Sequence, residues 1–320
     1  MLEIFNDIKE EILSVETELR NIVLGADPLI KDTSTHLINA GGKRLRPAFC
    51  FLGGKFYNYD SEKILPLAVA LELIHMATLV HDDVVDSSET RRNIPTVKAM
   101  WGNKISTHLG DYLFGKSLKL IAGYDNLIIP RVLADTSVKM CEGEIQQLST
   151  SNDVSQTIKD YFYRIKRKTA LLIAASCQLG AVACGAPESV HMPLRRYGHS
   201  IGMAFQITDD ILDLVADQAQ LGKPIGSDLR QGIVTLPLIY ALKHSPERDM
   251  LADLLTRDEK GEEEIKHACR LIVSCGGIEY SNKVVQKYID NAWKQLSSLP
   301  EVPARETLYT VAQFISIRKF

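Results

Sequence analysis

The amino-acid sequence predicts an all-α protein. Apolar residues near the N-terminus recur at alternating steps of three and four, the spacing of one face of a helix. These residues are Phe5, Ile8, Ile12, Val15, Leu19 and Ile22. Alternating runs of β-branched residues between turn signals, which would indicate strands, are missing. No linker, low-complexity run or repeat divides the chain, so we predict one domain over residues 1–320.

Turn signals separate the chain into about a dozen helical stretches. They fall at residues 24–28, 41–42, 93–95, 185–187 and 222–232. The first apolar stripe is expected to pack on its own domain rather than on a partner. Residues 169–187 are uncharged and approach the length of a membrane span. Their polar and small residues favour a fully buried core helix instead.

Composition is that of an ordinary globular protein, with 45% hydrophobic and 24% charged residues. The formal net charge of −3 provides no basic field of the kind that attracts nucleic acid. The N-terminus is acidic and amphipathic, unlike a signal peptide. The six cysteines form no C-x-x-C pair and no zinc spacing. We therefore expect reduced thiols in a cytoplasmic protein.

One pattern, D-D-x-x-D, occurs at residues 82–86 and again at residues 209–213. On a helix, residues four apart share a face, so Asp82 and Asp86 project together with Asp83 beside them. The two valines between them supply no charge. Carboxylates at such close quarters repel one another unless a cation lies among them.

Oxygen donors without histidine or cysteine suit a hard ion such as Mg²⁺ rather than zinc. Mg²⁺ usually keeps waters and shares substrate phosphates, so two such clusters would hold a polyphosphate between them through metal ions. A single D-D-x-x-D is typical of a solvated helix face. Two copies that each follow apolar sequence indicate a function instead.

Basic residues cluster at three further places. Residues 41–47 read Gly-Gly-Lys-Arg-Leu-Arg-Pro, in which the glycines permit close backbone approach and the arginines offer planar forks to phosphate oxygens. Arg91 and Arg92 follow the first acidic motif, and a basic run occupies residues 164–168. Each cluster alone is typical of a charged surface, and the last could indicate nucleic acid. Beside two metal-binding segments, we interpret them as counter-charge for diphosphates.

Taken together and in this order, the motifs resemble those of the trans-isoprenyl diphosphate synthases, over nearly the whole chain. The matching segments are residues 41–47, His75, residues 82–92, residues 143–147, Lys168-Thr169, residues 205–213 and residues 222–229. The resemblance implies the isoprenoid synthase fold, with helices around a central cavity that both acidic motifs face. The sequence departs from many relatives at Ile233, where they carry a lysine that contacts a diphosphate.

The resemblance also implies roles for individual residues. The diphosphate of isopentenyl diphosphate is expected to bind Lys43, Arg46, His75 and Arg92. The allylic diphosphate is expected to contact Arg91, Lys168, Thr169, Gln206 and Lys223. The expected direct ligands of Mg²⁺ are Asp82, Asp86 and Asp209. The catalytic set adds Asp83 and Asp210, which are expected beside the metal ligands together with Asp213.

The implied reaction is ionisation of the allylic diphosphate, condensation with isopentenyl diphosphate, and elimination of a proton. Metal ions and the cations Lys168, Lys223 and Arg91 would offset charge that grows on the leaving group. No side chain is an evident base, so the released diphosphate is expected to take the proton. His75 alone would be typical of a core histidine, but its place two turns before Asp82 favours ligand contact.

The helix before Asp82 is expected to line the tunnel that receives the growing chain. In short-chain relatives, a bulky aromatic residue just upstream blocks that tunnel. Here Ala77, Thr78 and Ile74 stand at these positions, and none is aromatic. By analogy we predict a long product. The segments around Lys168 and Lys223 most resemble catalytic subunits that make heptaprenyl diphosphate for a menaquinone side chain.

Such catalytic subunits pair with a non-catalytic subunit, whereas other members are homodimers, so the sequence leaves both assemblies open. We expect no nucleic acid and at most peripheral membrane contact. A terpene cyclase is disfavoured, because it lacks a site like that of Lys43, Arg46 and His75. A non-catalytic subunit is disfavoured because both aspartate motifs are intact. A short-chain synthase making farnesyl or geranylgeranyl diphosphate stays open, although Ala77 and Thr78 argue against it.

Overall fold

The computed structural model describes residues 2–215, 225–257 and 259–317. The chain divides into two compact units, each assembled from several stretches of sequence. Unit 1 comprises Met1–Ala134, Leu172–Gly198 and Leu296–Thr310, and unit 2 comprises Asp135–Leu171, His199–Gln295 and Val311–Phe320. The prediction of a single domain over residues 1–320 stays a prediction.

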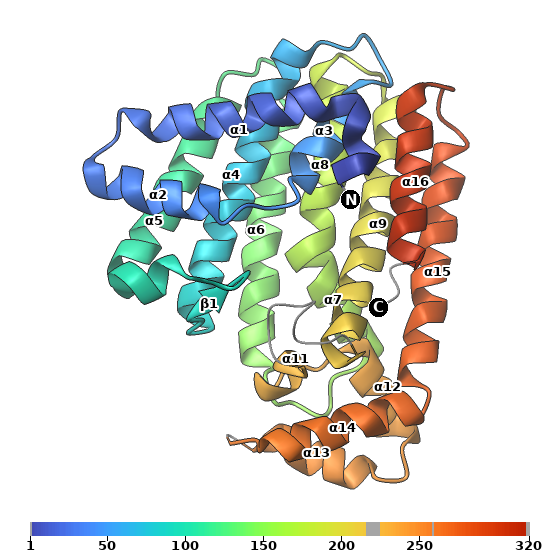
Figure 1. Ribbon diagram of the computed structural model, residues 1–320. Helices are drawn as coiled ribbons and strands as arrows, with labels where there is room; N and C mark the ends of the chain where they lie inside the picture. The colour runs from blue at the N-terminus through green and yellow to red at the C-terminus, as the bar shows by residue number, and fades with distance from the viewer. Residues whose placement is uncertain (1, 216–224, 258, 318–320) are drawn as a thin grey trace. The chain divides into compact units, whose positions relative to one another are not determined.

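Unit 1 begins with six helices that follow one another along the chain (Figure 1). They are η1 (Leu2–Ile8), α1 (Lys9–Leu24), α2 (Pro28–Asn39), α3 (Leu45–Gly54), α4 (Ser61–Val85) and α5 (Val97–Ile121). α4 and α5 run side by side, and α1 and α3 also contact α4. Val15 and Leu19 of α1 are fully buried. The prediction that the first apolar stripe packs on its own domain is confirmed within this unit.

The helix that ends in the first acidic motif is the centre of unit 1. Asp60 caps the start of α4 by accepting hydrogen bonds from the backbone N–H groups of Glu62 and Lys63. The helix is long and apolar enough to cross a bilayer, but 67% of its most apolar stretch is buried inside the structure. A helix that is apolar on every side and mostly buried is a core helix.

Unit 1 also contains nearly all of α8 (Leu171–Ala183) and the start of α9 (Glu188–Val215). α8 lies against α3 with glycines at the contact. A Cβ atom on Gly53 would lie 2.2 Å from the carbonyl oxygen of Cys177, and one on Gly180 would lie 1.8 Å from that of Cys50. The backbones of the two helices therefore touch, and the prediction of a buried core helix in residues 169–187 is confirmed.

Unit 2 holds most of α6 (Ile128–Ser149), the second part of α9, and a series of shorter helices. These are α7 (Ile158–Ile165), η2 (Lys166–Ala170), α11 (Ser227–Arg230), α12 (Leu236–His244), α13 (Arg248–Thr256), α14 (Glu262–Ser274) and α15 (Gly277–Leu296). The last helix, α16 (Pro303–Ile317), has residues in both units. α12 packs against α13 and α14.

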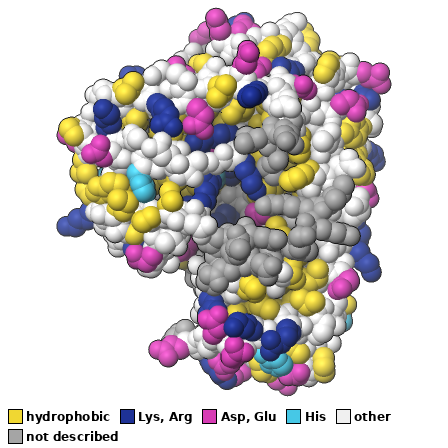
Figure 2. Space-filling model, viewed as in Figure 1, with side chains coloured by type: hydrophobic (Ala, Val, Ile, Leu, Met, Phe, Trp, Pro, Cys, Tyr) yellow, Lys and Arg dark blue, Asp and Glu magenta, His cyan; other side chains and the backbone are white. Residues whose placement is uncertain are grey.

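Acidic and basic side chains alternate over α13 and α14 (Figure 2). Arg257 pairs with Asp253 and, at 2.7 Å, with Glu264, and Lys266 pairs with Glu263 at 3.1 Å. Exposed ion pairs of this kind contribute little to stability. This face is a solvated charged surface.

The expectation of no strands is wrong for one short segment. β1 (Thr90–Arg91) pairs with β2 (Ile94–Pro95) in an antiparallel hairpin. The turn residues Arg92 and Asn93 have φ angles of 54° and 63°. Two-residue hairpin turns favour such positive φ values, but their usual sequence signals are Asn-Gly and Asp-Gly. Arg-Asn does not give that signal, so the sequence pattern did not predict the hairpin.

Candidate active site

The loop before α3 brings basic groups close to the backbone. Gly41 and Arg44 both have left-handed φ angles, 71° and 46°. A Cβ atom on Gly42 would lie 3.1 Å from Nη1 of Arg92 and 3.2 Å from Nη1 of Arg44. Glycine at this position therefore lets two guanidinium groups approach the main chain. The hairpin and the loop are thus adjacent within unit 1.

Arg44 does not have the role that the motif suggested. Its Nη1 donates to Oε1 of Glu72 at 2.9 Å and its Nε donates to Oε1 of Glu16. The side chains of Arg44 and Glu72 are only 4% and 3% exposed. The interpretation of Arg44 as diphosphate counter-charge is therefore replaced by a buried ion pair that joins the loop to α1 and α4. Lys43, by contrast, is exposed.

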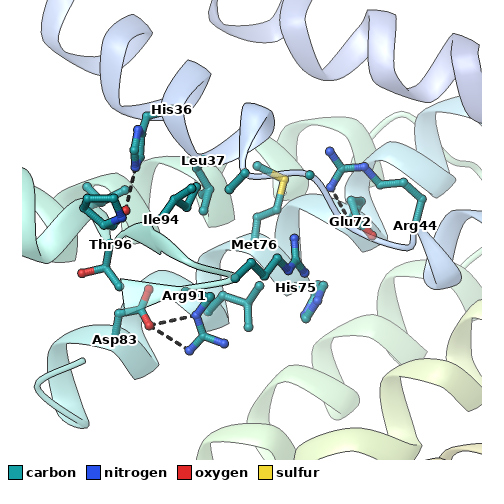
Figure 3. Close-up of a pocket in the computed structure, with 16 residues that line it drawn as sticks. His36, Leu37, Arg44, Glu72, His75, Met76, Asp83, Arg91, Ile94 and Thr96 are labelled. Carbon is teal, nitrogen blue, oxygen red and sulfur yellow. Dashed lines mark hydrogen bonds and ion pairs between the residues drawn. The ribbon is translucent and has the colours of Figure 1, made fainter. Parts of the chain in front are cut away.

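A pocket opens in unit 1 between α2, this loop, α4 and the hairpin (Figure 3). Arg44, His75, Arg91 and Arg92 line it, together with the acidic residues Glu72 and Asp83, which pair with Arg44 and Arg91. Burial, followed by the positive charge of Arg46 and Arg92, holds the pKa of His75 well below its usual value. His75 is therefore a neutral imidazole, able to donate a hydrogen bond without adding charge.

The three aspartates of the first motif differ in burial and in their contacts. Asp83 is 3% exposed, and its Oδ1 accepts a hydrogen bond from Nε of Arg91 at 2.9 Å and forms an ion pair with Nη2 at 2.8 Å (Figure 3). The valines within the motif carry no charge, as noted from the sequence, and the charge that pairs with Asp83 comes from Arg91. Asp82 and Asp86 are half-buried, one turn apart at the end of α4. These two carboxylates are the more accessible oxygen donors.

The three aspartates of the second motif, in unit 2, also differ in burial and in their contacts. Asp213 is 1% exposed, and its Oδ2 accepts a hydrogen bond from the backbone N–H of Asp228 at 3.1 Å. Asp210 is 5% exposed and accepts from Tyr161 Oη at 2.6 Å and Gln206 Nε2 at 2.9 Å. Burial raises the pKa of Asp210 to about 6. Asp209 is half-buried and is the accessible carboxylate of the three.

Lys168 and Thr169 lie on η2, a single π-helical turn between α7 and α8. Such turns are rare in proteins, and those that occur are often at functional sites. Nζ of Lys168 lies 2.9 Å from Oε2 of Glu144, and Oγ1 of Thr169 donates to Oε1 of Gln206 at 2.6 Å. The structure therefore brings together three of the residues predicted to bind the allylic diphosphate. Lys223 lies outside the described residues.

The predicted chain-length residues lie within α4. Ile74 and Ala77 are each 2% exposed, and Thr78 is half-buried. The hydroxyl of Thr78 donates to the carbonyl oxygen of His75 at 2.8 Å. This bond stays within the helix and ties no neighbouring element to it.

Three residues were not assigned a role by the sequence patterns but contact residues of the predicted motifs. They are Glu72, Glu144 and Tyr161. Glu144 stands inside a segment that matches the family. Glu72 and Tyr161 gave no signal in a single sequence, because burial of a polar side chain is decided by tertiary packing.

Among the described residues, no three acidic, histidine or cysteine side chains converge to hold a metal ion by themselves. Mg²⁺ is commonly bound by one or two carboxylates together with phosphate oxygens. The accessible aspartates of each motif supply oxygen donors only, which fits an ion shared with a diphosphate.

Comparison with known proteins extends over almost the entire chain. It is 45% identical over 316 residues to heptaprenyl diphosphate synthase component 2 of Geobacillus stearothermophilus, covering 99% of this chain and 98% of that relative. The crystal structure of heptaprenyl diphosphate synthase from Staphylococcus aureus superposes with a TM-score of 0.93 at 34% identity, covering 97% of this chain and 98% of that one.

A polyprenyl synthase from Caulobacter crescentus CB15, complexed with calcium and isoprenyl diphosphate, matches with a TM-score of 0.94 at 33% identity, over 98% of this chain and 97% of that chain. These matches confirm the predicted all-α isoprenoid synthase fold and the prediction of a prenyltransferase. The polyprenyl synthetase family model matches residues 27–272. The chain therefore belongs to the polyprenyl synthetase family and is a polyprenyl diphosphate synthase.

Proposed function

We propose that the chain is a long-chain trans-polyprenyl diphosphate synthase, which condenses an allylic prenyl diphosphate with successive isopentenyl diphosphates to give heptaprenyl diphosphate. The observation that best supports catalysis is that both D-D-x-x-D motifs are intact and each keeps an accessible first aspartate, Asp82 and Asp209. A subunit that only binds a catalytic chain does not need either feature.

The loop, the first turn of α3 and α4 of unit 1 would hold isopentenyl diphosphate. Lys43 and Arg46 would bind its diphosphate with Arg92 from the hairpin, and neutral His75 would donate a hydrogen bond. The buried pair of Arg44 and Glu72 would fix the loop that carries Lys43. A homoallylic site of this kind distinguishes the chain from a terpene cyclase, which ionises the same diphosphate but adds no isopentenyl unit.

The allylic diphosphate would be held by Arg91, Lys168, Thr169 and Gln206, with Lys223 as a further expected contact. Fixed positive charge near the leaving group stabilises the negative charge that develops as the C–O bond breaks. The double bond of isopentenyl diphosphate would then attack the allylic cation. The released diphosphate would accept the proton that the product loses.

Mg²⁺ is the proposed cofactor, with Asp82, Asp86 and Asp209 as its protein ligands. When bound, it would supply Lewis-acid polarisation of the allylic diphosphate. Asp83 and Asp210 would act from beside the ion, because Arg91 holds the first and Tyr161 the second. Oxygen-only donors suit Mg²⁺ better than softer metals.

The proposed product length is supported by the small side chain of Ala77 and by Thr78, which precede Asp82 on α4. An aromatic side chain there would shorten the space available to the growing chain. The relative from Geobacillus stearothermophilus named as heptaprenyl diphosphate synthase component 2 supports the same length. A product of this length would serve as a menaquinone side chain.

The name of that relative also supports an assembly of this chain with a second, non-catalytic component, in place of a homodimer. Either assembly would be a dimer. We propose that it works in the cytoplasm, with at most peripheral contact with a membrane. The six cysteines, all free thiols in the structure, agree with a reducing compartment.

The purified chain should be incubated with farnesyl diphosphate, labelled isopentenyl diphosphate and Mg²⁺, alone and with candidate second components. Chromatography of the dephosphorylated products then gives their length. Heptaprenyl product is expected once the correct component is present. Farnesyl or geranylgeranyl product under all conditions would favour the short-chain alternative, and no product with any component would reject the proposal.

A further inference from the structure

Arg164 of α7 is a buried cation at the edge of the second aspartate motif. Its side chain is only 4% exposed. Nη1 donates to Oε1 of Gln156 at 2.7 Å, and Nη2 donates to the carbonyl oxygen of Val234 at 2.5 Å. Both acceptors are neutral. A buried full charge is costly unless an opposite charge lies near it.

Burial lowers the pKa of Arg164, and among nearby carboxylates that of Asp210 opposes this shift most, followed by those of Asp228 and Glu144. Tyr161 contacts both Arg164 and Asp210: the guanidinium of Arg164 is 5.6 Å from the centroid of its ring, and its hydroxyl donates to Oδ2 of Asp210 at 2.6 Å. Tyr161 and Asp210 are themselves buried, at 0% and 5% exposed. Coulomb attraction between buried groups is screened far less than at a surface.

Hydrogen bonds connect Asp210 to residues of the proposed allylic site. Its Oδ1 accepts from Nε2 of Gln206, and Oε1 of Gln206 in turn accepts from the hydroxyl of Thr169. Because each of these polar groups holds the next, a change at Arg164 would alter the orientation of Gln206 and of the adjacent Asp209. Such networks rigidify a site only while every member is satisfied.

The other guanidinium nitrogen of Arg164, Nη2, binds the segment that follows the second motif. The carbonyl group that binds Nη2 belongs to Val234, and its neighbour Ile233 donates its backbone N–H to the carbonyl oxygen of Asp228 at 2.8 Å. Position 233 therefore directly precedes the residue whose carbonyl group binds the guanidinium. Its own side chain adds no charge.

We infer that Arg164 is a positioning residue that provides, from α7, fixed positive charge beside the second aspartate motif. A lysine introduced at position 233, next to the residue whose carbonyl group binds Arg164, should then replace this charge in part. This inference rests on the proposed function of the second motif in binding an allylic diphosphate through Mg²⁺.

Four proteins test it: wild type, Arg164→Met, Ile233→Lys, and the double variant. Arg164→Met should lower kcat about 10- to 100-fold, the usual range for loss of one charged interaction. Ile233→Lys alone should change kcat less than about threefold, and in the double variant it should recover about tenfold or more of the loss. Lys159→Met is the matched control, because it removes a charge from an exposed position of the same helix.

A binding readout accompanies the kinetics. Magnesium pyrophosphate should raise the melting temperature of wild type, and this shift should be lost in Arg164→Met and restored in the double variant. A folded Arg164→Met protein with normal turnover, or a double variant no better than Arg164→Met, would overturn the inference. A wild-type protein that makes no prenyl product under any condition would instead reject the proposed function.

Tyr161→Phe decides the matter if Arg164→Met does not fold. It keeps the ring that packs against Arg164 and removes only the hydroxyl that binds Asp210. The expected result is a higher KM for the allylic substrate with an unchanged KM for isopentenyl diphosphate. Equal KM values in wild type and variant for both substrates would contradict the network.

Discussion

At the scale of single residues, the basic motif before and within the start of α3 contains cations with different roles. Residues 43–46 contribute three cations, yet the left-handed backbone of Arg44 turns its side chain into a buried ion pair while Lys43 stays exposed. A non-glycine residue in this conformation is uncommon and persists where its surroundings hold it firmly. Here Glu16 and Glu72 hold it, so the motif encodes both a scaffold and a binding surface.

Replacing Arg44 should therefore destabilise the protein much more than replacing Lys43. Arg44→Met leaves the carboxylate of Glu72 buried without its partner, which typically costs about 3–5 kcal/mol of unfolding free energy. Lys43→Met removes an exposed charge and should change that free energy by less than about 0.5 kcal/mol. Urea unfolding followed by circular dichroism measures both. Similar midpoints for the two variants would contradict the scaffold role of Arg44.

His75 should make stability depend on pH. Its pKa is held well below the usual value of about 6.5, first by burial and then by nearby arginines, so the unfolded chain binds more protons than the folded chain below that pH. Stability should fall as the pH drops through about 6.5, by up to about 1.4 kcal/mol per pH unit. His75→Gln should flatten this part of the curve.

Urea unfolding of wild type and His75→Gln between about pH 8 and pH 5.5 gives the two curves to compare. They should be parallel above the pKa of an unperturbed histidine and diverge below it. If the two proteins lose stability in parallel throughout, His75 does not cause the pH dependence. The assignment of His75 as a neutral imidazole would then be wrong.

At the scale of elements, the sequence could predict the helices whose burial follows their own periodicity. The stripe of α1 and the uncharged α8 are examples, because each pattern determines which face is buried. The hairpin β1–β2 and the π-helical turn η2 could not be predicted. Their backbone conformations depend on contacts made elsewhere, such as Arg91 with Asp83 and Lys168 with Glu144.

The same limit applies to the candidate site. The aspartates and most cations could be chosen from motif and spacing, since their chemistry is visible in the residue types. The partners that fix them could not be chosen in this way, because Glu72 and Tyr161 lie far along the chain from the groups that they hold. Only the fold makes Tyr161 a neighbour of Asp210.

The helix α4 should also control product length. If its face before Asp82 lines the tunnel, Ala77→Phe should shorten the product toward farnesyl or geranylgeranyl diphosphate while the first condensation continues at nearly the same rate. Ala68 is fully buried nine residues earlier, on the opposite face at about 100° per residue. Ala68→Phe is therefore a matched control for the overpacking penalty, about 1–3 kcal/mol.

Chromatography of the dephosphorylated products compares the two variants after circular dichroism has established that each is folded. Shortening in Ala77→Phe but not in Ala68→Phe is the expected result. A folded, active Ala77→Phe enzyme with the product length of wild type would place the tunnel elsewhere, and the argument for a long product from Ala77 would be lost.

At the scale of the whole molecule, each compact unit contributes one aspartate motif. Asp82 belongs to unit 1 and Asp209 to unit 2. If Asp82 and Asp209 both bind metal ions on a diphosphate, as proposed, the loss of either should weaken ligand binding, and bound ligand stabilises the folded chain. A ligand present at about 100 times its Kd adds about 2.7 kcal/mol to folding, which is a shift of several degrees in melting temperature.

Magnesium pyrophosphate should therefore raise the melting temperature of wild type, and either Asp82→Ala or Asp209→Ala alone should remove most of that shift and reduce turnover about a thousandfold. Asp249→Ala, which removes an exposed carboxylate from α13, should keep the full shift. Pyrophosphate with EDTA in place of Mg²⁺ separates the contribution of the metal from that of the anion. Two independent sites would give a different result, because each single variant would then keep about half of the shift of wild type, and the double variant alone would lose it.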